Sequence, residues 1–191
     1  MSRVRVARIS DADAIAAIYA PVVRETAISF ETEPPTAETM AQRIAETLVT
    51  HPWLVAELGE EVVGYAYAGK HRERAAYRWS VDVSGYVRED VRRLGIGRAL
   101  YEALITILRA QGFRSAFAGI ALPNAASVSL HEAVGFKFLG VYKEAGFKHG
   151  RWHDVGWWRL GLSESAGSPE EPKPFAAMRE MIERGGQFVC P

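Results

Sequence analysis

Cysteine is almost absent from this sequence of 191 residues, since Cys190, next to the C-terminus, is the only one. A single cysteine can form neither an internal disulfide nor a cysteine-based metal cluster. Because chain ends are usually poorly ordered, Cys190 is also a poor candidate for a catalytic nucleophile. The cysteine content therefore favours a reducing compartment, and we expect a cytoplasmic protein.

The sequence also lacks an excess of charge of either sign and any long apolar run. Lys and Arg number 23, as do Asp and Glu, so no net field would hold a nucleic acid or an anionic membrane. No segment approaches the roughly 20 apolar residues of a membrane span, and the N-terminus lacks a signal-peptide core. We expect a protein that is neither exported nor embedded and that binds no nucleic acid.

The hydrophobic periodicity predicts one mixed domain with the element order β-α-α-β-β-β-α-β-α-β-β. A meander of three strands followed by a strand-helix-strand crossover requires both antiparallel and parallel pairing. The predicted class is α/β (α+β), with a mixed central sheet of about seven strands flanked by helices. The predicted segments are a strand at 4–6, helices from 14 and from 36, strands at 53–58, 62–68 and 79–87, a helix at 97–110, a strand at 115–120, a helix at 124–133, and strands at 136–142 and 155–162.

The composition changes after residue 163, where a Ser-, Glu- and Pro-rich stretch precedes an amphipathic segment at Phe175–Arg184. We therefore expect a domain at 1–163, followed at 164–191 by a linker and a short C-terminal helix. That helix could dock on the domain or on a second subunit.

The strongest local motif lies between a predicted strand and a predicted helix. Glycines in such a turn let successive N–H groups converge, and the helix N-terminus adds positive potential, which suits a pyrophosphate. The turn lacks the third glycine of a dinucleotide-binding Rossmann motif and the Gly-Lys-Ser/Thr of a Walker loop. Coenzyme A is the common pyrophosphate ligand that remains, and the predicted cradle consists of Arg92, Arg93, Leu94, Gly95, Ile96 and Gly97.

This turn resembles the Gln/Arg-x-x-Gly-x-Gly/Ala signature of the GCN5-related N-acetyltransferases, and the element order resembles their fold. The segment at 124–136, Asn followed by a helix and Gly-Phe, resembles their second signature. Within that superfamily the chain is similar to the phosphinothricin and methionine sulfoximine acetyltransferases. The similarity covers about residues 4–162, and its matching stretches are Phe30-Glu-Thr-Glu-Pro34, Pro52-Trp-Leu-Val-Ala-Glu57, Tyr67-Ala-Gly69, Leu122-Pro-Asn124, Ser127-Val128, His131-Glu-Ala133, Ala145-Gly-Phe-Lys-His-Gly150 and Trp152-His-Asp-Val-Gly156.

The resemblance implies roles for particular residues around acetyl-coenzyme A. The backbone of Gly85, Tyr86 and Val87 would pair with the pantetheine arm, which Asn124 would also reach. Only a neutral amine can attack the thioester, so a base is needed. Asp82, at a position where the resembled enzymes have glutamate, is the candidate base and would act through a water. His131 would protonate the departing thiolate or help to deprotonate the amine.

For the substrate, an amino acid with a second anionic group calls for arginine forks and hydroxyls. The candidates are Phe30, Glu31 and Thr32 on an early loop, and Arg74 and Tyr77 ahead of the third meander strand. Arg72 and Arg78 could instead be surface charges. The spacing of His149 and His153 fits no common metal site, so we expect no metal and assign both to shaping a loop or a dimer contact.

The resulting hypothesis is an enzyme that transfers acetyl from acetyl-coenzyme A to the amino group of phosphinothricin or a related glutamate-like amino acid. The resemblance also implies a homodimer. Two alternatives stay open. One is an acetyltransferase for another amine, such as an aminoglycoside or a protein N-terminus, and the other is a catalytically idle acyl-coenzyme A binder.

Overall fold

The computed structural model describes residues 2–163, 167–184 and 188–189, so the predictions about Cys190 lie outside the described residues. The predicted order of elements up to residue 162 is confirmed, apart from three short 3-10 helices between them. The elements are β1 (Ser2–Val6), α1 (Ala12–Glu25), α2 (Ala37–Thr50), β2 (Trp53–Leu58), β3 (Glu61–Lys70), β4 (Ser80–Val87), α3 (Ile96–Gln111), β5 (Ser115–Ala121), α4 (Ala125–Ala133), β6 (Lys137–Lys148), β7 (Arg151–Gly161), α5 (Phe175–Arg184) and β8 (Phe188–Val189).

A single mixed sheet organises the molecule, in the order β6-β7-β5-β4-β3-β2-β1-β8. The pairing of β4 with β5 is parallel, as the crossover through α3 requires, and the neighbouring pairs are antiparallel. The seven strands up to β7 confirm the predicted sheet. The two-residue β8, which pairs with β1, was not expected from the sequence.

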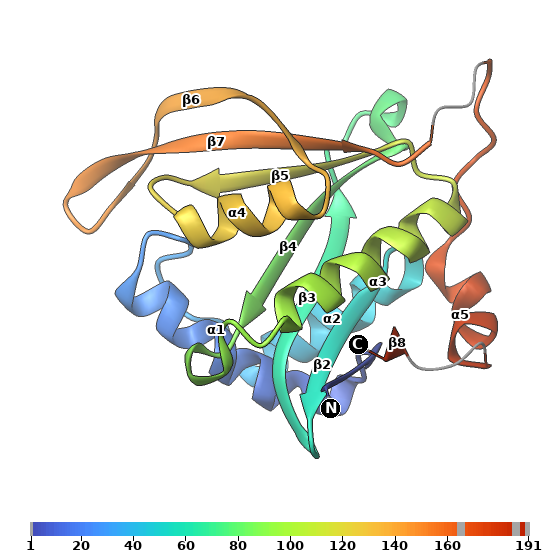
Figure 1. Cartoon of the computed structure of the whole chain (residues 1–191), viewed down its shortest axis with the longest axis horizontal. Helices are drawn as coiled ribbons and strands as arrows, with labels where there is room; N and C mark the ends of the chain where they lie inside the picture. The colour runs from blue at the N-terminus through green and yellow to red at the C-terminus, as the bar shows by residue number, and fades with distance from the viewer. Residues whose placement is uncertain (1, 164–166, 185–187, 190–191) are drawn as a thin grey trace.

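Helices cover both faces of the sheet, and the alternation of side chains along the strands assigns each residue to one face. Helix α3 crosses one face, while α1 and α2 lie against the other (Figure 1). Gly64 on β3 faces α3, since a Cβ there would meet Leu100, whereas Tyr65 and Tyr67 line a cavity with residues of α1 and α2. Asp82 lies opposite Gly69 and two residues from Ser84, the partner of Tyr67, so its side chain belongs to the α1 and α2 face.

The β6–β7 hairpin is longer than predicted and runs along the edge of the molecule (Figure 1). The sequence predicted strands at 136–142 and 155–162, but pairing continues through Gly146 and His153 to the turn before Arg151. The register shifts between Tyr142 and Gly146, and this irregularity breaks the alternation on which the prediction depended.

The C-terminal helix α5 has the predicted bounds and packs on the domain. Phe175 is fully buried in the same hydrophobic core as the sheet, and Met178 is also buried. Ahead of the helix, the Lys173 N–H donates to the Gln111 carbonyl, and the Gln111 side chain donates to the Lys173 carbonyl. The linker segment is further held by Arg78, which pairs with Glu171 at 2.7 Å.

Candidate active site

The parallel strands β4 and β5 separate part-way along their length. They pair only from Ser80 with Ser115 to Asp82 with Phe117, although β4 continues to Val87 and β5 to Ala121. Beyond Asp82, the described ladder of β4 lies on its β3 side alone. The backbone of Gly85, Tyr86 and Val87, which the resemblance assigns to the cofactor arm, therefore borders a fork between the two strands.

The glycine-containing turn follows β4 directly and ends at α3. Arg93 has a φ of 68° and Gly95 one of 79°, so two left-handed residues curl the backbone just before the helix. Gly95 precedes the helix without a side-chain cap, and a Cβ there would meet nothing within 4 Å. The turn thus presents an uncapped helix N-terminus beside exposed Arg92, Arg93 and Leu94, a geometry that suits an anionic group.

Two glycines of the predicted cofactor region also serve packing. A Cβ at Gly85 would lie 2.8 Å from the ring of Tyr101, and one at Gly97 would lie 3.1 Å from Leu130 of α4. Asn124 caps α4, since its side-chain oxygen accepts a hydrogen bond from the Ser127 N–H at 3.1 Å. Its side-chain NH₂ group is the part that could serve the cofactor.

The side chain of Asp82, at the point where the strands separate, contacts a histidine that was not among the residues selected from the sequence. Oδ1 of Asp82 lies 2.6 Å from Nδ1 of His71, and Arg72 approaches the other carboxylate oxygen at 4.0 Å. Burial raises the pKa of Asp82 above its ordinary value, against the lowering effect of His71 and Arg72. The aspartate thus belongs to a small charged cluster.

His131 occupies a different environment from Asp82. Its ring is buried on the α3 side, edge-on to Tyr101 at 4.8 Å and to Phe136 at 5.2 Å. Nδ1 donates to the Ser127 carbonyl at 2.7 Å, and the buried Nε2 has no protein partner among the described residues. Burial lowers the pKa of His131 and so favours the neutral imidazole. The contacts of the described residues do not bring His131 to Asp82, whose side chain points to the opposite face.

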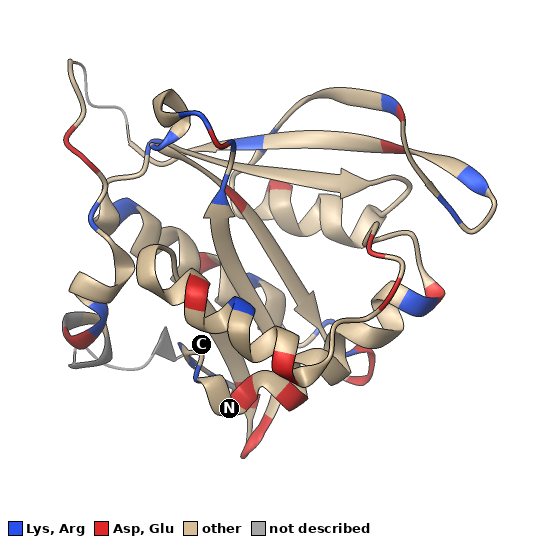
Figure 2. Ribbon diagram, turned by 180° about the vertical axis from the view of Figure 1, so that it is seen from behind, with Lys and Arg blue, Asp and Glu red and all other residues tan. Residues whose placement is uncertain are grey.

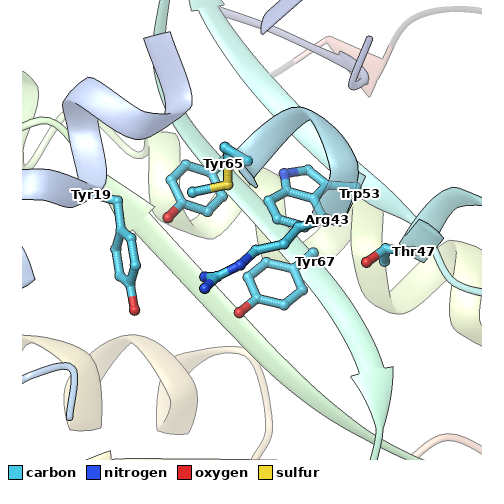
Figure 3. Close-up of a pocket in the computed structure, with 7 residues that line it drawn as sticks. Tyr19, Arg43, Thr47, Trp53, Tyr65 and Tyr67 are labelled. Atoms are coloured by element: carbon cyan, nitrogen blue, oxygen red, sulfur yellow. The ribbon is translucent and has the colours of Figure 1, made fainter. Parts of the chain in front are cut away.

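A cavity of about 190 Å³ lies on the same face as Asp82, lined by four aromatic rings, one arginine and two further residues of α2. Figure 3 shows the guanidinium of Arg43 among the rings of Tyr19, Tyr65 and Tyr67. Tyr67 connects this cavity to the strand that carries Asp82, because its hydroxyl bonds to Ser84. Burial raises the pKa of Tyr67, and the nearby charge of Asp82 adds a smaller effect in the same direction. Arg43 was not predicted from the sequence.

The early loop reaches the same cavity through Glu31. Arg43 donates two hydrogen bonds to the Glu31 carboxylate, at 2.8 and 3.1 Å, and Tyr19 donates a third at 3.1 Å. Burial alone favours the neutral acid, but the bonds from Arg43 hold the pKa of Glu31 below its ordinary value. The two side chains form an ion pair at the cavity, with 41% of the Arg43 side chain and 36% of the Glu31 side chain exposed.

The β6–β7 hairpin fixes this loop in position. Nζ of buried Lys148 donates to the carbonyls of Val23 and Ser29, both at 2.7 Å. A Cβ at Gly146 would overlap the Phe30 ring, so the missing side chain is what allows Phe30 to rest on β6. His149 approaches the Thr26 carbonyl at 3.2 Å and His153 the Lys148 carbonyl at 3.0 Å. His149 therefore contacts this loop directly, whereas His153 bonds within the hairpin, to the residue whose side chain holds the loop.

The remaining predicted substrate residues lie at the edge of the site. Thr32 is exposed, and Arg74 and Tyr77 line a separate hollow with Lys70 and residues of the linker. The ring of Tyr77 nevertheless stands edge-on to His71, with centroids 5.8 Å apart. Figure 2 shows Lys and Arg positions gathered in the loop between β3 and β4, which carries these residues. Arg74 thus adds to the positive charge near the site without lining the Arg43 cavity.

Comparison with known proteins identifies the family that has this fold and site. The profile of the acetyltransferase (GNAT) domain matches residues 4–157. The chain belongs to the GNAT acetyltransferase family. It is 40% identical to a phosphinothricin N-acetyltransferase of Streptomyces viridochromogenes over 178 residues, which cover 93% of this chain and 95% of the relative.

Other relatives of this GNAT chain support the same grouping. It is 39% identical to an L-methionine sulfoximine/L-methionine sulfone acetyltransferase of Pseudomonas paraeruginosa, over 87% of this chain and 98% of the relative. The crystal structure of a phosphinothricin acetyltransferase from Sinorhizobium meliloti in complex with acetyl-coenzyme A superposes with a TM-score of 0.85 at 37% identity, over 89% of this chain and 94% of that one. The chain is therefore an acetyl-coenzyme A-dependent acyltransferase.

The residues present fit this co-substrate. The open edge of β4 offers backbone groups to an amide-containing arm, and the turn before α3 offers N–H groups and two arginines to phosphates. Across the described part of the chain, no three His, Cys, Asp or Glu side chains gather as a metal site, and no helix is long and apolar enough to span a bilayer.

Proposed function

We propose that this GNAT enzyme acetylates the free amino group of phosphinothricin or a related glutamate-like amino acid, such as methionine sulfoximine or methionine sulfone. The observation that carries the proposal is the Arg43 cavity, which lies on the same face of the sheet as Asp82 and is lined by Tyr67 of β3, the partner of Ser84 on β4. The names of the similar enzymes from Streptomyces viridochromogenes and Pseudomonas paraeruginosa support it.

Two cations flank the proposed reaction centre. Arg43 lines the cavity among tyrosines, and Arg72 lies 4.0 Å from Asp82 over the ring of Trp157. An amino acid with a carboxylate and a second acceptor group, anionic in phosphinothricin and neutral but polar in the methionine sulfone and sulfoximine, can use two such partners. An aminoglycoside would instead need an acidic cleft. Phe30 and Glu31 would close the same cavity from the early loop. Thr32, Arg74 and Tyr77 would contribute from its rim.

On the cofactor side, Arg92 to Gly97 would hold the pyrophosphate, while Gly85, Tyr86, Val87 and the NH₂ group of Asn124 would hold the arm. The co-substrate supplies an activated thioester carbonyl. Asp82, at the fork, would belong to the group of side chains that removes the proton from the attacking amine. His131 would lie near the departing sulfur, with its Nε2 as the group that has no protein partner among the described residues.

We also propose that the enzyme is a cytoplasmic homodimer. The support for a dimer is a set of large apolar side chains that β6 and β7 leave 54–60% exposed, namely Phe138, Leu139, Tyr142, Phe147 and Trp152. Clusters of this kind mark protein contacts more often than solvent-facing surface. Sedimentation analysis of wild type and Trp152→Glu tests the point, because a dimer held by this face would dissociate in the variant.

Thiol release from acetyl-coenzyme A tests the substrate proposal. The panel is phosphinothricin, methionine sulfoximine, methionine sulfone, glutamate, an N-terminal peptide and an aminoglycoside, with N-acetylated methionine sulfoximine as the control that lacks a free amine. We expect turnover with the first four, highest kcat/KM with the sulfoximine or phosphinothricin, and none with the control. Turnover confined to the peptide or the aminoglycoside would refute the proposal.

A further inference from the structure

His71 is held in one orientation by contacts from four elements or loops. Its ring stacks on Phe117 of β5, with centroids 4.2 Å apart and an angle of 16° between the planes. Tyr77 and Trp157 stand edge-on to it at 5.8 and 6.3 Å. Asp82 of β4 lies 2.6 Å from Nδ1. A histidine fixed in this way at the fork has a defined edge to present to a ligand.

The bond to Asp82 determines which ring nitrogen carries the proton. A carboxylate can only accept, so Nδ1–H of His71 must donate. In the neutral ring, Nε2 then keeps its lone pair. The side chain remains 12% exposed, and none of the described residues is hydrogen-bonded to Nε2. A carboxylate that fixes the tautomer of an imidazole leaves the other nitrogen as a base.

We infer that His71, oriented by Asp82, is the general base that takes the proton of the substrate amine; this rests on the acetyl transfer proposed above. The substrate enters as an ammonium ion and loses one proton to become nucleophilic. As its nitrogen attacks, the N–C bond forms, the C–S bond breaks with its electron pair on sulfur, and Nε2 accepts the second N–H proton. One proton ends on the thiol and one leaves to solvent, which balances the reaction.

The surroundings of the pair favour this division of roles. One oxygen of Asp82 accepts a hydrogen bond from His71, and the guanidinium of Arg72 lies 4.0 Å from the other oxygen. Both carboxylate oxygens therefore already have a neighbouring donor or cation. Asp82 then stabilises the imidazolium that forms when Nε2 is protonated. The charged and titratable groups that the structure places against His71 are Asp82, Arg72 and Tyr77, since β5 and β7 contribute aromatic rings.

Kinetics of single and double variants test the assignment. We expect His71→Ala and His71→Asn to lower kcat about 100-fold or more, with the affinity for acetyl-coenzyme A unchanged. His71→Asn keeps a donor for Asp82 and guards against lost packing. Adding Asp82→Glu to either variant should recover at least tenfold, because the longer carboxylate reaches toward the position of the missing Nε2. Glu73→Gln, in the same loop, is the matched control and should retain wild-type kcat.

A second readout requires no turnover. In the protein without acetyl-coenzyme A, ¹⁵N NMR of the neutral histidines should assign the hydrogen of His71 to Nδ1, and Asp82→Leu should shift the ring toward the Nε2–H form. Full activity of His71→Asn, no recovery in the double variants, or an Nε2–H ring in the wild type would each overturn the base assignment. A wild-type enzyme that acetylates no member of the panel would instead refute the proposed function.

Discussion

Nδ1 of His71 lies 2.6 Å from Oδ1 of Asp82, so the loop after β3 places an imidazole against the carboxylate at the fork of β4 and β5. The geometry follows from the antiparallel register, in which Gly69 lies opposite Asp82 and the chain turns back two residues later. Arg72 follows directly and brings a positive charge to the second carboxylate oxygen. The protonation of this cluster should therefore respond to the charge of Arg72.

Replacing Arg72 by glutamine should move the acid limb of the kcat/KM profile to higher pH. Burial already raises the pKa of Asp82, and the charge of Arg72 lowers it. Loss of that charge raises the pKa of Asp82 further, so the ionised carboxylate that orients His71 appears only at higher pH. Arg109→Gln, an exposed change in the last turn of α3, is the control and should leave the profile in place. An unmoved acid limb in Arg72→Gln would show that Asp82 does not govern it.

Arg43→Gln should weaken binding of the amino acid substrate. Its guanidinium lines the cavity, and a charge-assisted hydrogen bond contributes about 1.5–3 kcal/mol, so KM should rise by roughly 10- to 100-fold. The proposed cradle for acetyl-coenzyme A, residues 92–97, does not line this cavity, so the dissociation constant of acetyl-coenzyme A should stay unchanged. Steady-state kinetics and calorimetry with each ligand distinguish the two. Arg151→Gln, at the start of β7, serves as the exposed control.

Gly146→Ala should impair substrate binding because the added methyl group displaces the ring of Phe30. An added Cβ overlaps Phe30, which must move, whereas a Cβ added at Gly140 on the same strand would meet nothing within 4 Å. We therefore expect KM for the amino acid to rise in Gly146→Ala and to stay unchanged in Gly140→Ala. Equal kinetics in the two variants would remove Phe30 from the substrate site.

The framework of this site could be predicted well from the sequence because it depends on local periodicity. Alternation along β4 placed Asp82 on the polar face, and the glycine turn marked the start of α3. The partners of Asp82 could not be predicted in this way. His71 stands in a charged loop, where its sequence pattern is that of a solvated surface until the strand register brings it to Asp82. Arg43 likewise has the pattern of a solvated helix face until the packing of α2 brings it to the cavity.

The separation of Asp82 and His131 is a further case where tertiary structure decides. The family resemblance implied catalytic roles for both residues around the same thioester. Strand alternation directs Asp82 toward α1 and α2, while α4 packs His131 against Tyr101 of α3. The face of the sheet to which the Asp82 side chain points could have been derived from the alternation along β4. The face on which α4 packs, and with it the position of His131, depends instead on how the chain crosses between strands.

Arg93→Gly and Arg93→Ala separate backbone strain from charge at the phosphate turn. Arg93 has a φ of 68°, a conformation that costs a residue with a Cβ about 1–2 kcal/mol. The glycine variant should therefore unfold at a higher temperature than the alanine variant. Both variants lose the same charge, so both should bind acetyl-coenzyme A more weakly than wild type and by the same factor. The affinity of both variants should also depend less on salt concentration. Wild-type affinity in both, measured by calorimetry, would exclude Arg93 from the cradle.

The buried imidazole of His131 should make stability depend on pH. Burial lowers its pKa in the folded protein, so as the pH falls below about 6.5 the unfolded chain takes up a proton that the folded chain resists. The contribution of His131 is thus fully present above about pH 6.5 and is lost as the pH falls through the lowered folded pKa. His131→Leu, which suits the surrounding rings, should show a smaller drop in Tm between about pH 7.5 and 5.5 than wild type. His149→Gln, at an exposed histidine, should show the wild-type drop, and an equal drop in all three proteins would mean that His131 ionises as readily folded as unfolded.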